Sequence, residues 1–178
     1  MMEVIIGGSG SGKSRYAEKL IEQNAKEGLP RYYIATMKVY GDEGKSRVRK
    51  HREQRKNLRF ITIEQETEIE KAIGKMTPGK GATLVECISN LVANEMFDGK
   101  NDFDPEKILK GIRQLKTFCE PLIVVTNNVF EDGGAYDEET KRYMDGLAGV
   151  NAGLIQMADK VTEVVAGIPV PLKGEEKR

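Results

Sequence analysis

The chain carries close to its amino end the stretch Gly7-Gly8-Ser9-Gly10-Ser11-Gly12-Lys13-Ser14, which matches the phosphate-binding loop pattern G-x-x-x-x-G-K-[ST]. The apolar stretch Val4-Ile5-Ile6 precedes it and predicts a strand, whereas the apolar residues that follow recur at helical spacing. In such a unit the glycines let several N–H groups face one phosphate, and the helix amino terminus adds its positive dipole. Lys13 can then reach the β- and γ-phosphates, and the Ser14 hydroxyl is placed to bind Mg²⁺. The stretch therefore predicts binding of a nucleoside triphosphate.

Length and composition predict one nucleotide-binding catalytic domain over residues 1–173 and a disordered tail over 174–178. The chain carries 28 basic and 28 acidic side chains, so its overall charge indicates neither nucleic acid nor an acidic membrane as a partner. No signal peptide is expected, because Met1-Met2-Glu3 runs directly into the first predicted strand. No membrane insertion is expected, because no apolar stretch approaches the length of a membrane span. Cys87 and Cys119 lack metal-ligand spacing and are expected to be reduced thiols. These features favour a soluble cytoplasmic enzyme.

Apolar, β-branched runs alternate along the chain with stretches of helical periodicity. Strands are predicted at Glu3–Ile6, Arg31–Ala35, Arg59–Ile63, Ala82–Glu86, Leu122–Thr126 and Lys160–Val165. Helices are predicted at Lys13–Glu27, Asp42–Lys56, Thr67–Ile73, Ile88–Phe97, Pro105–Phe118 and Glu138–Asp159, the last with a candidate break near Gly146 and Gly149. This alternation is typical of a P-loop NTPase-type three-layer α/β fold with a mostly parallel central sheet, which binds ligands at the carboxyl ends of its strands.

The predicted strand Ala82–Glu86 ends in a carboxylate. P-loop enzymes commonly place an acidic residue at such a strand end to hold Mg²⁺ or its water ligands, so Glu86 is a candidate for this role. A strand-end glutamate that caps the next helix or faces solvent would produce the same pattern. The sequence leaves both interpretations open.

Seven of the twelve residues from Lys45 to Lys56 are basic, and His51, the only histidine of the chain, lies among them. In a helix, Arg47 and Arg55 would share the face of His51 and could neutralise a triphosphate or a leaving pyrophosphate. Neighbouring positive charge also favours the neutral imidazole, whose free nitrogen can attack phosphorus. A solvated basic helix with an incidental histidine explains the same residues, whereas the scarcity of aromatic residues disfavours a nucleic-acid patch.

Further stretches with a characteristic order and spacing extend over nearly the whole chain. They are Tyr33-Ile34-Ala35-Thr36, His51-Arg52-Glu53-Gln54-Arg55, Thr62-Ile63-Glu64, Leu84-Val85-Glu86-Cys87-Ile88-Ser89-Asn90-Leu91-Val92, Val125-Thr126-Asn127 and Gly167-Ile168-Pro169. Together with the phosphate-binding loop they make the chain resemble the bifunctional adenosylcobinamide kinase/adenosylcobinamide-phosphate guanylyltransferase family of cobalamin biosynthesis.

The resemblance implies two successive reactions. Family members phosphorylate the aminopropanol hydroxyl of adenosylcobinamide with a nucleoside triphosphate, then transfer GMP from GTP to that phosphate through a guanylylated histidine, which releases pyrophosphate and gives adenosylcobinamide-GDP. His51 matches the family's nucleophile and with Lys13 is the predicted catalytic pair, whereas Ser14 and Glu86 are the predicted Mg²⁺ ligands. The positions that match the family's nucleotide-binding segments are Gly7 to Ser14, Ile34, Ala35, Thr36, Arg52, Glu53, Gln54, Arg55, Glu64 and Glu86. The implied partners are GTP, ATP, adenosylcobinamide and further copies of the chain, with a trimer as the expected form.

The chain departs from the family pattern at several positions. Gly10 replaces an arginine that many members carry, and Gly149 lies near a second expected arginine. Asn128 and Phe130 stand where the family tends to have Glu and Gly, and Lys56 stands where it usually has Pro. Because these departures fall mainly on loops expected at the carboxyl ends of the strands, they bear on the kinase step and the corrinoid contacts more than on GTP binding.

Two other functions agree with the residues alone. One is a P-loop kinase of another small metabolite, in which His51 is incidental. The other is a non-catalytic nucleotide-binding switch, in which the predicted loop from Glu131 to Glu139 reports the nucleotide state. Only the bifunctional enzyme is expected to take up a covalent label from α-labelled GTP.

Overall fold

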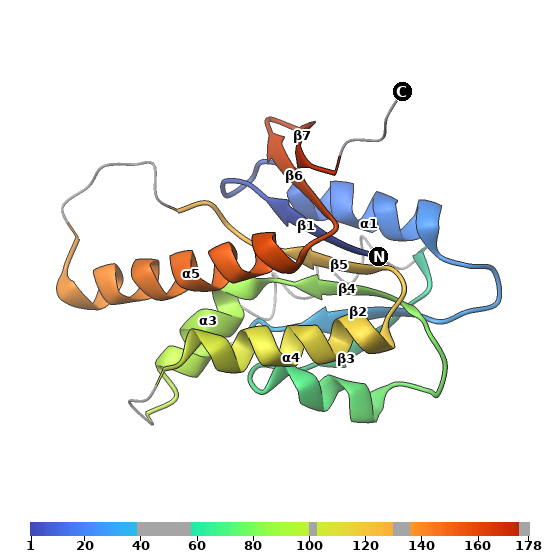
Figure 1. Ribbon diagram of the computed structural model, residues 1–178, viewed down its shortest axis with the longest axis horizontal. Helices are drawn as coiled ribbons and strands as arrows, with labels where there is room; N and C mark the ends of the chain where they lie inside the picture. Colours follow the sequence, from blue (N-terminus) through green and yellow to red (C-terminus); the bar gives the residue numbers. More distant parts are fainter. Residues whose placement is uncertain (39–57, 100–102, 130–135, 175–178) are drawn as a thin grey trace.

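The computed structural model describes residues 1–38, 58–99, 103–129 and 136–174. Within these residues the strands are β1 (Met2–Ile6), β2 (Arg31–Ala35), β3 (Phe60–Glu64), β4 (Ala82–Glu86), β5 (Leu122–Val125), β6 (Lys160–Val165) and β7 (Ile168–Lys173). They form one sheet in the order β3-β2-β4-β5-β1-β6-β7, in which all neighbours are parallel except β6 and β7. The predicted mostly parallel sheet is confirmed (Figure 1). Arg59 precedes β3 instead of beginning it, since its backbone is left-handed (φ 55°).

Strand β7 is not predicted by the sequence pattern. It carries Pro169 and Pro171, and proline cannot donate a hydrogen bond to a sheet, so the stretch lacks the signature of a strand. The structure places β7 at the edge of the sheet, antiparallel to β6, which is where prolines are tolerated. The turn Ala166-Gly167 joins the two strands with positive φ at both residues (49° and 83°), as two-residue hairpin turns of this kind require.

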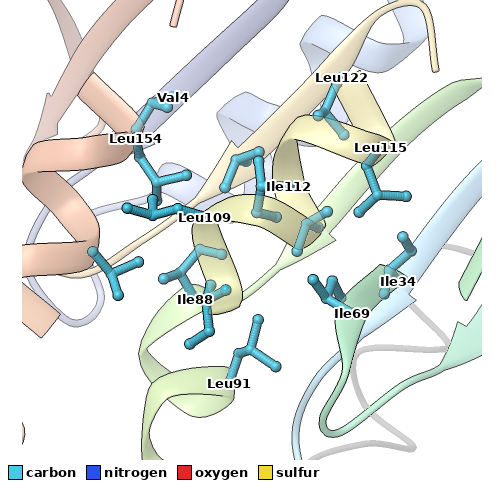
Figure 2. Close-up of a cluster of buried hydrophobic side chains, with 14 of the residues drawn as sticks. Val4, Ile34, Ile69, Ile88, Leu91, Leu109, Ile112, Leu115, Leu122 and Leu154 are labelled. Atoms are coloured by element: carbon cyan, nitrogen blue, oxygen red, sulfur yellow. The ribbon is translucent and has the colours of Figure 1, made fainter. Parts of the chain in front are cut away.

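Helices cover both faces of the sheet. Helix α1 (Lys13–Asn24) lies on one face, and the other face is covered by α3 (Ile88–Met96), α4 (Pro105–Phe118), α5 (Glu138–Met157) and the 3₁₀ helix η2 (Ile69–Lys75). The buried apolar side chains form one cluster on each side, and Figure 2 shows part of the larger one, with Ile112 of α4 among residues of the neighbouring elements. This confirms the predicted three layers. No helix in the described ranges is both long and apolar enough to cross a bilayer.

Helix boundaries differ from the prediction in four places, two of them only slightly, since α3 ends at Met96 instead of Phe97 and α5 ends at Met157 instead of Asp159. Helix α1 ends at Asn24 and not at Glu27, because the next residue is already extended. The helix predicted over Thr67–Ile73 is instead the 3₁₀ helix η2, which follows Glu68 in a left-handed conformation (φ 50°). The helix predicted over Asp42–Lys56 lies outside the described residues.

Helix α5 runs unbroken through Gly146 and Gly149, so the predicted break is wrong. Two of its glycines allow close packing instead. A Cβ added at Gly146 would lie 2.7 Å from Met96 Cε, and one added at Gly153 would overlap Leu109 Cδ1. These residues let α5 approach α3 and α4 closely, which helps to hold the helical layer on this face of the sheet.

Gly149 and Gly153 provide a matched test of this packing. Gly149→Ala is expected to raise the free energy of unfolding by about 0.5–1 kcal/mol, because alanine favours a helix and the atom nearest to its Cβ is Pro105 Cγ at 3.8 Å. Gly153→Ala is expected to lower the free energy of unfolding by about 1–3 kcal/mol, because its methyl group would overpack Leu109. Urea unfolding of both variants measures the difference, and equal effects at the two positions would contradict the packing described.

Candidate nucleotide-binding site

The carboxyl ends of β1, β2, β4 and β5 lie along one edge of the sheet, and the residues that follow them form the candidate site. Ile5 of β1 pairs with Val125, and Ala35 of β2 pairs with Glu86. The phosphate-binding loop follows β1 and leads into α1. Because parallel strands end at the same edge, segments far apart in the sequence converge around the loop.

The backbone of the phosphate-binding loop requires glycine at particular positions. Gly10 and Gly12 have positive φ (72° and 92°), which side-chain-bearing residues rarely adopt. At Gly7 the limit is space, since an added Cβ would lie 2.6 Å from the carbonyl oxygen of Val164 and 2.7 Å from Ser11 Oγ. Gly12 is also the N-cap of α1, so the unpaired N–H groups of the first helical turn lie at the loop. This arrangement has the features of an anion-binding loop.

Two other segments hold the loop by main-chain contacts. The N–H of Gly167, in the β6–β7 turn, donates to the carbonyl of Ser11 (2.8 Å). The N–H of Asn128, after β5, donates to the carbonyl of Gly7 (3.1 Å). The β6–β7 hairpin, whose second strand the sequence pattern does not predict, therefore supports one side of the phosphate-binding loop.

Three side chains of the predicted site meet beside the loop. Lys13 Nζ donates to the carbonyl of Gly8 (2.8 Å), and Ser14 Oγ donates to Glu86 Oε1 (2.5 Å). Burial lowers the pKa of the Lys13 ammonium below its ordinary value, and the nearby groups of Cys87 and Glu86 partly offset that shift. The Glu86 carboxylate therefore reaches the phosphate-binding loop and does not cap helix α3.

Thr36 joins the carboxyl ends of β2 and β4. Its buried hydroxyl donates to the carbonyl of Cys87 (2.7 Å) and accepts from the N–H of Cys87 (2.8 Å), while its own N–H donates to the carbonyl of Glu86 (3.0 Å). Ile34 points into the larger core cluster, and Ala35 packs against the smaller one. A nucleotide contact at Ile34 would therefore have to come from its main chain.

A polar network beside Thr36 was not predicted. Asn127 Nδ2 donates to Ser89 Oγ (2.7 Å), and Asn151 of α5 accepts from Thr126 Oγ1 (2.7 Å) and donates to the carbonyl of Asn127 (3.2 Å). Ser89 and Asn151 are both buried. Because the members come from β5, α3, α5 and their loops, no local sequence pattern signals the network, although Ser89, Thr126 and Asn127 lie in stretches that carry the family resemblance.

Both cysteines are unbridged thiols, as predicted, and the structure buries both. Burial raises the pKa of each thiol, so both are protonated at neutral pH. Cys87 Sγ lies 2.7 Å from Ser89 Oγ and so belongs to the network. A protonated, buried thiol is a weak nucleophile.

The remaining predicted residues are not brought to the loop within the described part of the chain. Glu64 ends β3 at the edge of the sheet, where β2, β4 and β5 separate it from β1, and its side chain is exposed. Its carbonyl accepts from Lys75 Nζ (2.9 Å). His51, Arg52, Glu53, Gln54 and Arg55 lie outside the described residues, as does Phe130.

The loop, its place after β1 and the parallel sheet define a P-loop NTPase-type α/β protein. Two solved structures share this fold. One is the flagellar accessory protein FlaH from Methanocaldococcus jannaschii (TM-score 0.50, 12% identity, covering 97% of this chain and 77% of that chain). The other is the structure of an ATPase domain (TM-score 0.51, 10% identity, covering 91% of this chain and 68% of that chain). At such low identity these likenesses concern the fold alone.

Sequence comparison shows the family. The model of the CobU family, cobinamide kinase / cobinamide phosphate guanyltransferase, matches residues 3–172, and the chain belongs to this family. It is 32% identical to the bifunctional adenosylcobalamin biosynthesis protein CobU of Escherichia coli K12, covering 97% of this chain and 100% of the relative. It is 30% identical to the corresponding CobP of Pseudomonas aeruginosa (98% and 99% covered) and 33% identical to CobU of Salmonella typhimurium (97% and 100% covered). The resemblance inferred from the motifs is confirmed.

The close approach at Gly7 can be tested against its neighbour. Gly7→Ala is expected to lower the free energy of unfolding by about 1–3 kcal/mol and to weaken triphosphate binding, because its methyl group would collide with the main chain of Val164. Gly8→Ala is expected to keep the parental stability, since no atom lies within 4 Å of an added Cβ. Urea unfolding and GTP titration measure both effects. A Gly7→Ala protein with parental stability would contradict the geometry of the loop.

Proposed function

We propose that this chain phosphorylates the aminopropanol hydroxyl of adenosylcobinamide with a nucleoside triphosphate and then transfers GMP from GTP to the phosphate it has made. The family match over residues 3–172 supports both reactions. The observation that carries the proposal is the convergence of Lys13, Ser14 and Glu86 beside the phosphate-binding loop. We also propose that residues 1–173 form one catalytic domain and that the protein is a homo-oligomer in solution.

Each part of the loop has a role in the kinase step. The N–H groups at the start of α1 would bind phosphate oxygens, and Lys13 would exchange its bond to the carbonyl of Gly8 for one to the β- or γ-phosphate. A phosphate dianion next to Lys13 stabilises the ammonium form, which offsets the effect of burial on its pKa. The substrate hydroxyl then attacks the γ-phosphorus: a new O–P bond forms, the bond to the β-phosphate oxygen breaks, the nucleoside diphosphate leaves, and the hydroxyl proton passes to solvent.

The donor atoms at this point fit Mg²⁺. Ser14 Oγ and Glu86 Oε1 lie 2.5 Å apart, and hydroxyl and carboxylate oxygens are ligands that Mg²⁺ prefers. No group of three or more His, Cys, Asp or Glu in the described ranges could hold a metal ion, so substrate phosphates and water would complete the coordination. When bound there, Mg²⁺ neutralises charge on the phosphates of the triphosphate.

For the second reaction we propose His51 as the nucleophile. Its neutral imidazole nitrogen attacks the α-phosphorus of GTP, so that a P–N bond forms, the bond between the α- and β-phosphates breaks, and pyrophosphate leaves. An oxygen of the cobinamide phosphate then attacks the same phosphorus, the P–N bond breaks, and the imidazole is regenerated. The support for His51 is its place as the only histidine of the chain, within the H-x-x-x-R arrangement that ends at Arg55.

The negative charge of the Glu86 carboxylate is expected to be needed for full kinase turnover. Glu86→Gln keeps an oxygen that can accept from Ser14 Oγ, so the fold should be retained. Kinase turnover should fall by about 10- to 100-fold, and more Mg²⁺ should be needed for half-maximal rate, because a charge that stabilises the metal is lost. The control is Glu120→Gln, an exposed carboxylate that pairs with Lys26 and Lys80. Parental kinetics of Glu86→Gln across a Mg²⁺ titration would remove Glu86 from the metal site.

His51→Asn separates the two reactions. Incubation of the parent protein with α-labelled GTP should give an acid-labile covalent label that pyrophosphate removes, as expected of a P–N bond. The variant should lose this label and the transfer of GMP while it keeps most of its kinase activity, because γ-phosphoryl transfer needs the loop, the metal and the substrate hydroxyl.

The same labelling experiment discriminates among the three functions. A kinase of another metabolite would take no label and would be unaffected by His51→Asn, and a nucleotide-binding switch would bind GTP without turnover. A label found on a residue other than His51 would show that the nucleophile has been wrongly assigned.

A further inference from the structure

Asn127 takes no part in the steps proposed above, although it lies in a stretch that carries the family resemblance. Strand β5 lies between β1 and β4 in the sheet. The segment that follows β5 therefore emerges between the phosphate-binding loop, which follows β1, and Glu86, which ends β4. Asn127 is the second residue of this segment. The order of the strands thus brings it to the place where the phosphates of a bound triphosphate are expected.

The main chain around Asn127 is held by bonds that do not use its side chain. The N–H of Asn128 donates to the carbonyl of Gly7 (3.1 Å), and the carbonyl of Asn127 accepts from Asn151 Nδ2 of α5 (3.2 Å). These bonds fix the segment against the phosphate-binding loop. The side chain of Asn127 is therefore not required to place it.

The side-chain amide of Asn127 has one strong and one weak contact. Its Nδ2 donates to Ser89 Oγ (2.7 Å) and lies 3.9 Å from Cys87 Sγ. A thiol sulfur is a weak acceptor, so the second hydrogen can be given to a better one. Burial lowers the pKa of Lys13, and Cys87 and Glu86 oppose that shift, so both groups lie near its ammonium. The available hydrogen of Asn127 thus lies close to the amine that is expected to bind phosphate.

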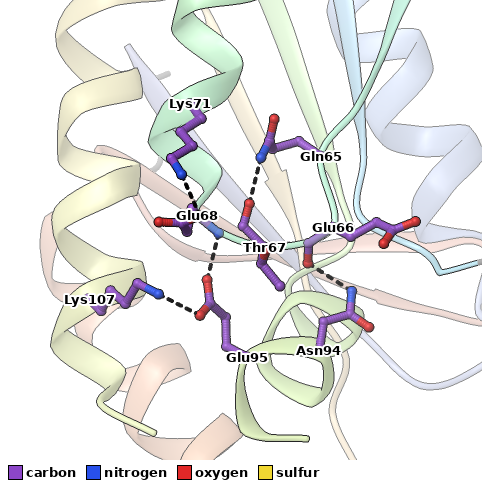
Figure 3. A network of polar contacts seen from close by, with 8 residues as sticks. All are labelled: Gln65, Glu66, Thr67, Glu68, Lys71, Asn94, Glu95 and Lys107. Carbon is purple, nitrogen blue, oxygen red and sulfur yellow. Dashed lines mark hydrogen bonds and ion pairs between the residues drawn. The ribbon is translucent and has the colours of Figure 1, made fainter. Parts of the chain in front are cut away.

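Asn94, at the same edge of the sheet, provides a contrast. Its amide donates to the carbonyls of Thr36 (2.7 Å) and Glu66 (2.8 Å), and Figure 3 shows it directed at the segment after β3. Both hydrogens of Asn94 are in short bonds to main-chain carbonyls, and these bonds join the exits of β2 and β3. Asn94 therefore has a structural role, whereas Asn127 retains a hydrogen that a ligand can accept.

We infer that Asn127 is a further catalytic residue of the kinase step, in which its Nδ2 donates a hydrogen bond to the γ-phosphate of the nucleoside triphosphate beside Lys13. This inference rests on the proposed function. The phosphate oxygen replaces the weak contact with Cys87, the bond to Ser89 is kept, and the amide neither gains nor loses a proton. A donor in this place stabilises charge on the phosphoryl group during transfer. It also distinguishes a triphosphate from a diphosphate, which lacks the group that accepts the bond.

The test measures the affinity of Asn127→Ala for a triphosphate and for the matching diphosphate. The probes are the α,β-methylene analogues of GTP and GDP, titrated with Mg²⁺ and without corrinoid, because they cannot donate GMP and the γ-phosphate then has no acceptor. Affinity for the triphosphate is expected to fall by about 10- to 100-fold, as for a lost hydrogen bond to a charged group. Affinity for the diphosphate should stay within about twofold, since the lost bond is absent there. The kcat of the kinase step should fall by about 100-fold.

Two variants separate this role from a structural one. Asn94→Ala is the matched control, because it removes an amide at the same sheet edge and should leave the ratio of the two affinities unchanged. Ser89→Ala removes the same bond between Asn127 and α3 that Asn127→Ala removes, but it leaves the amide in place. It should therefore change the ratio less than Asn127→Ala does.

Equal loss of affinity for the two analogues in Asn127→Ala would overturn the inference. A ratio that Ser89→Ala changes as much as Asn127→Ala would overturn it too, since Asn127 would then act only by holding α3. If Asn127→Ala does not fold, Asn127→Asp decides by the same ratio, because its carboxylate cannot donate. A parent protein that phosphorylates no cobinamide would instead refute the proposed function, whereas the two affinities need no corrinoid and still test Asn127.

Discussion

The candidate site depends on the pair of hydrogen bonds between the Thr36 hydroxyl and the main chain of Cys87. Both residues are buried, so a donor or acceptor left without a partner there would be costly. The pair joins the end of β2 to the end of β4 and keeps the main chain of Glu86 in place, and the Glu86 carboxylate then meets Ser14. The Thr36–Cys87 contact thus supports the position of Glu86 beside the phosphate-binding loop, although neither β2 nor β4 is adjacent to β1 in the sheet.

The two sides of the loop are held by different means. The β6–β7 turn and the segment after β5 bind main-chain atoms of the loop, at Ser11 and Gly7. Farther along the sheet edge, side-chain amides connect the loops, with Asn127 and Asn151 near β5 and Asn94 near β2. Such amides suit this edge because each can donate and accept hydrogen bonds without carrying a charge.

Local patterns predicted much of the architecture. Strand β2 and helix α4 occur at the predicted bounds, because the aromatic and β-branched run Tyr32-Tyr33-Ile34 and the sequence Asp104-Pro105 are strong local signals. Asp104 does cap α4 by accepting from the N–H of Glu106. The failures arose where tertiary contacts outweigh local preference. Strand β7 forms despite two prolines because it lies at the edge of the sheet. Helix α5 continues through Gly146 instead of breaking there, and the missing side chain leaves room for Met96 of α3 to pack against it.

The amino-acid sequence by itself determined the phosphate-binding loop, the alternation of strands and helices, and the family, since each is recorded in residues close together or in a fixed order along the chain. It also determined that Glu86 ends a strand, but not what its carboxylate meets. Only the tertiary structure decided that Glu86 contacts Ser14, that Thr36 is bound to Cys87, and that Asn94 joins two strand exits. The physical reason is that parallel strands bring their carboxyl ends to one edge in an order different from that of the sequence, so contacts between their loops have no local signature.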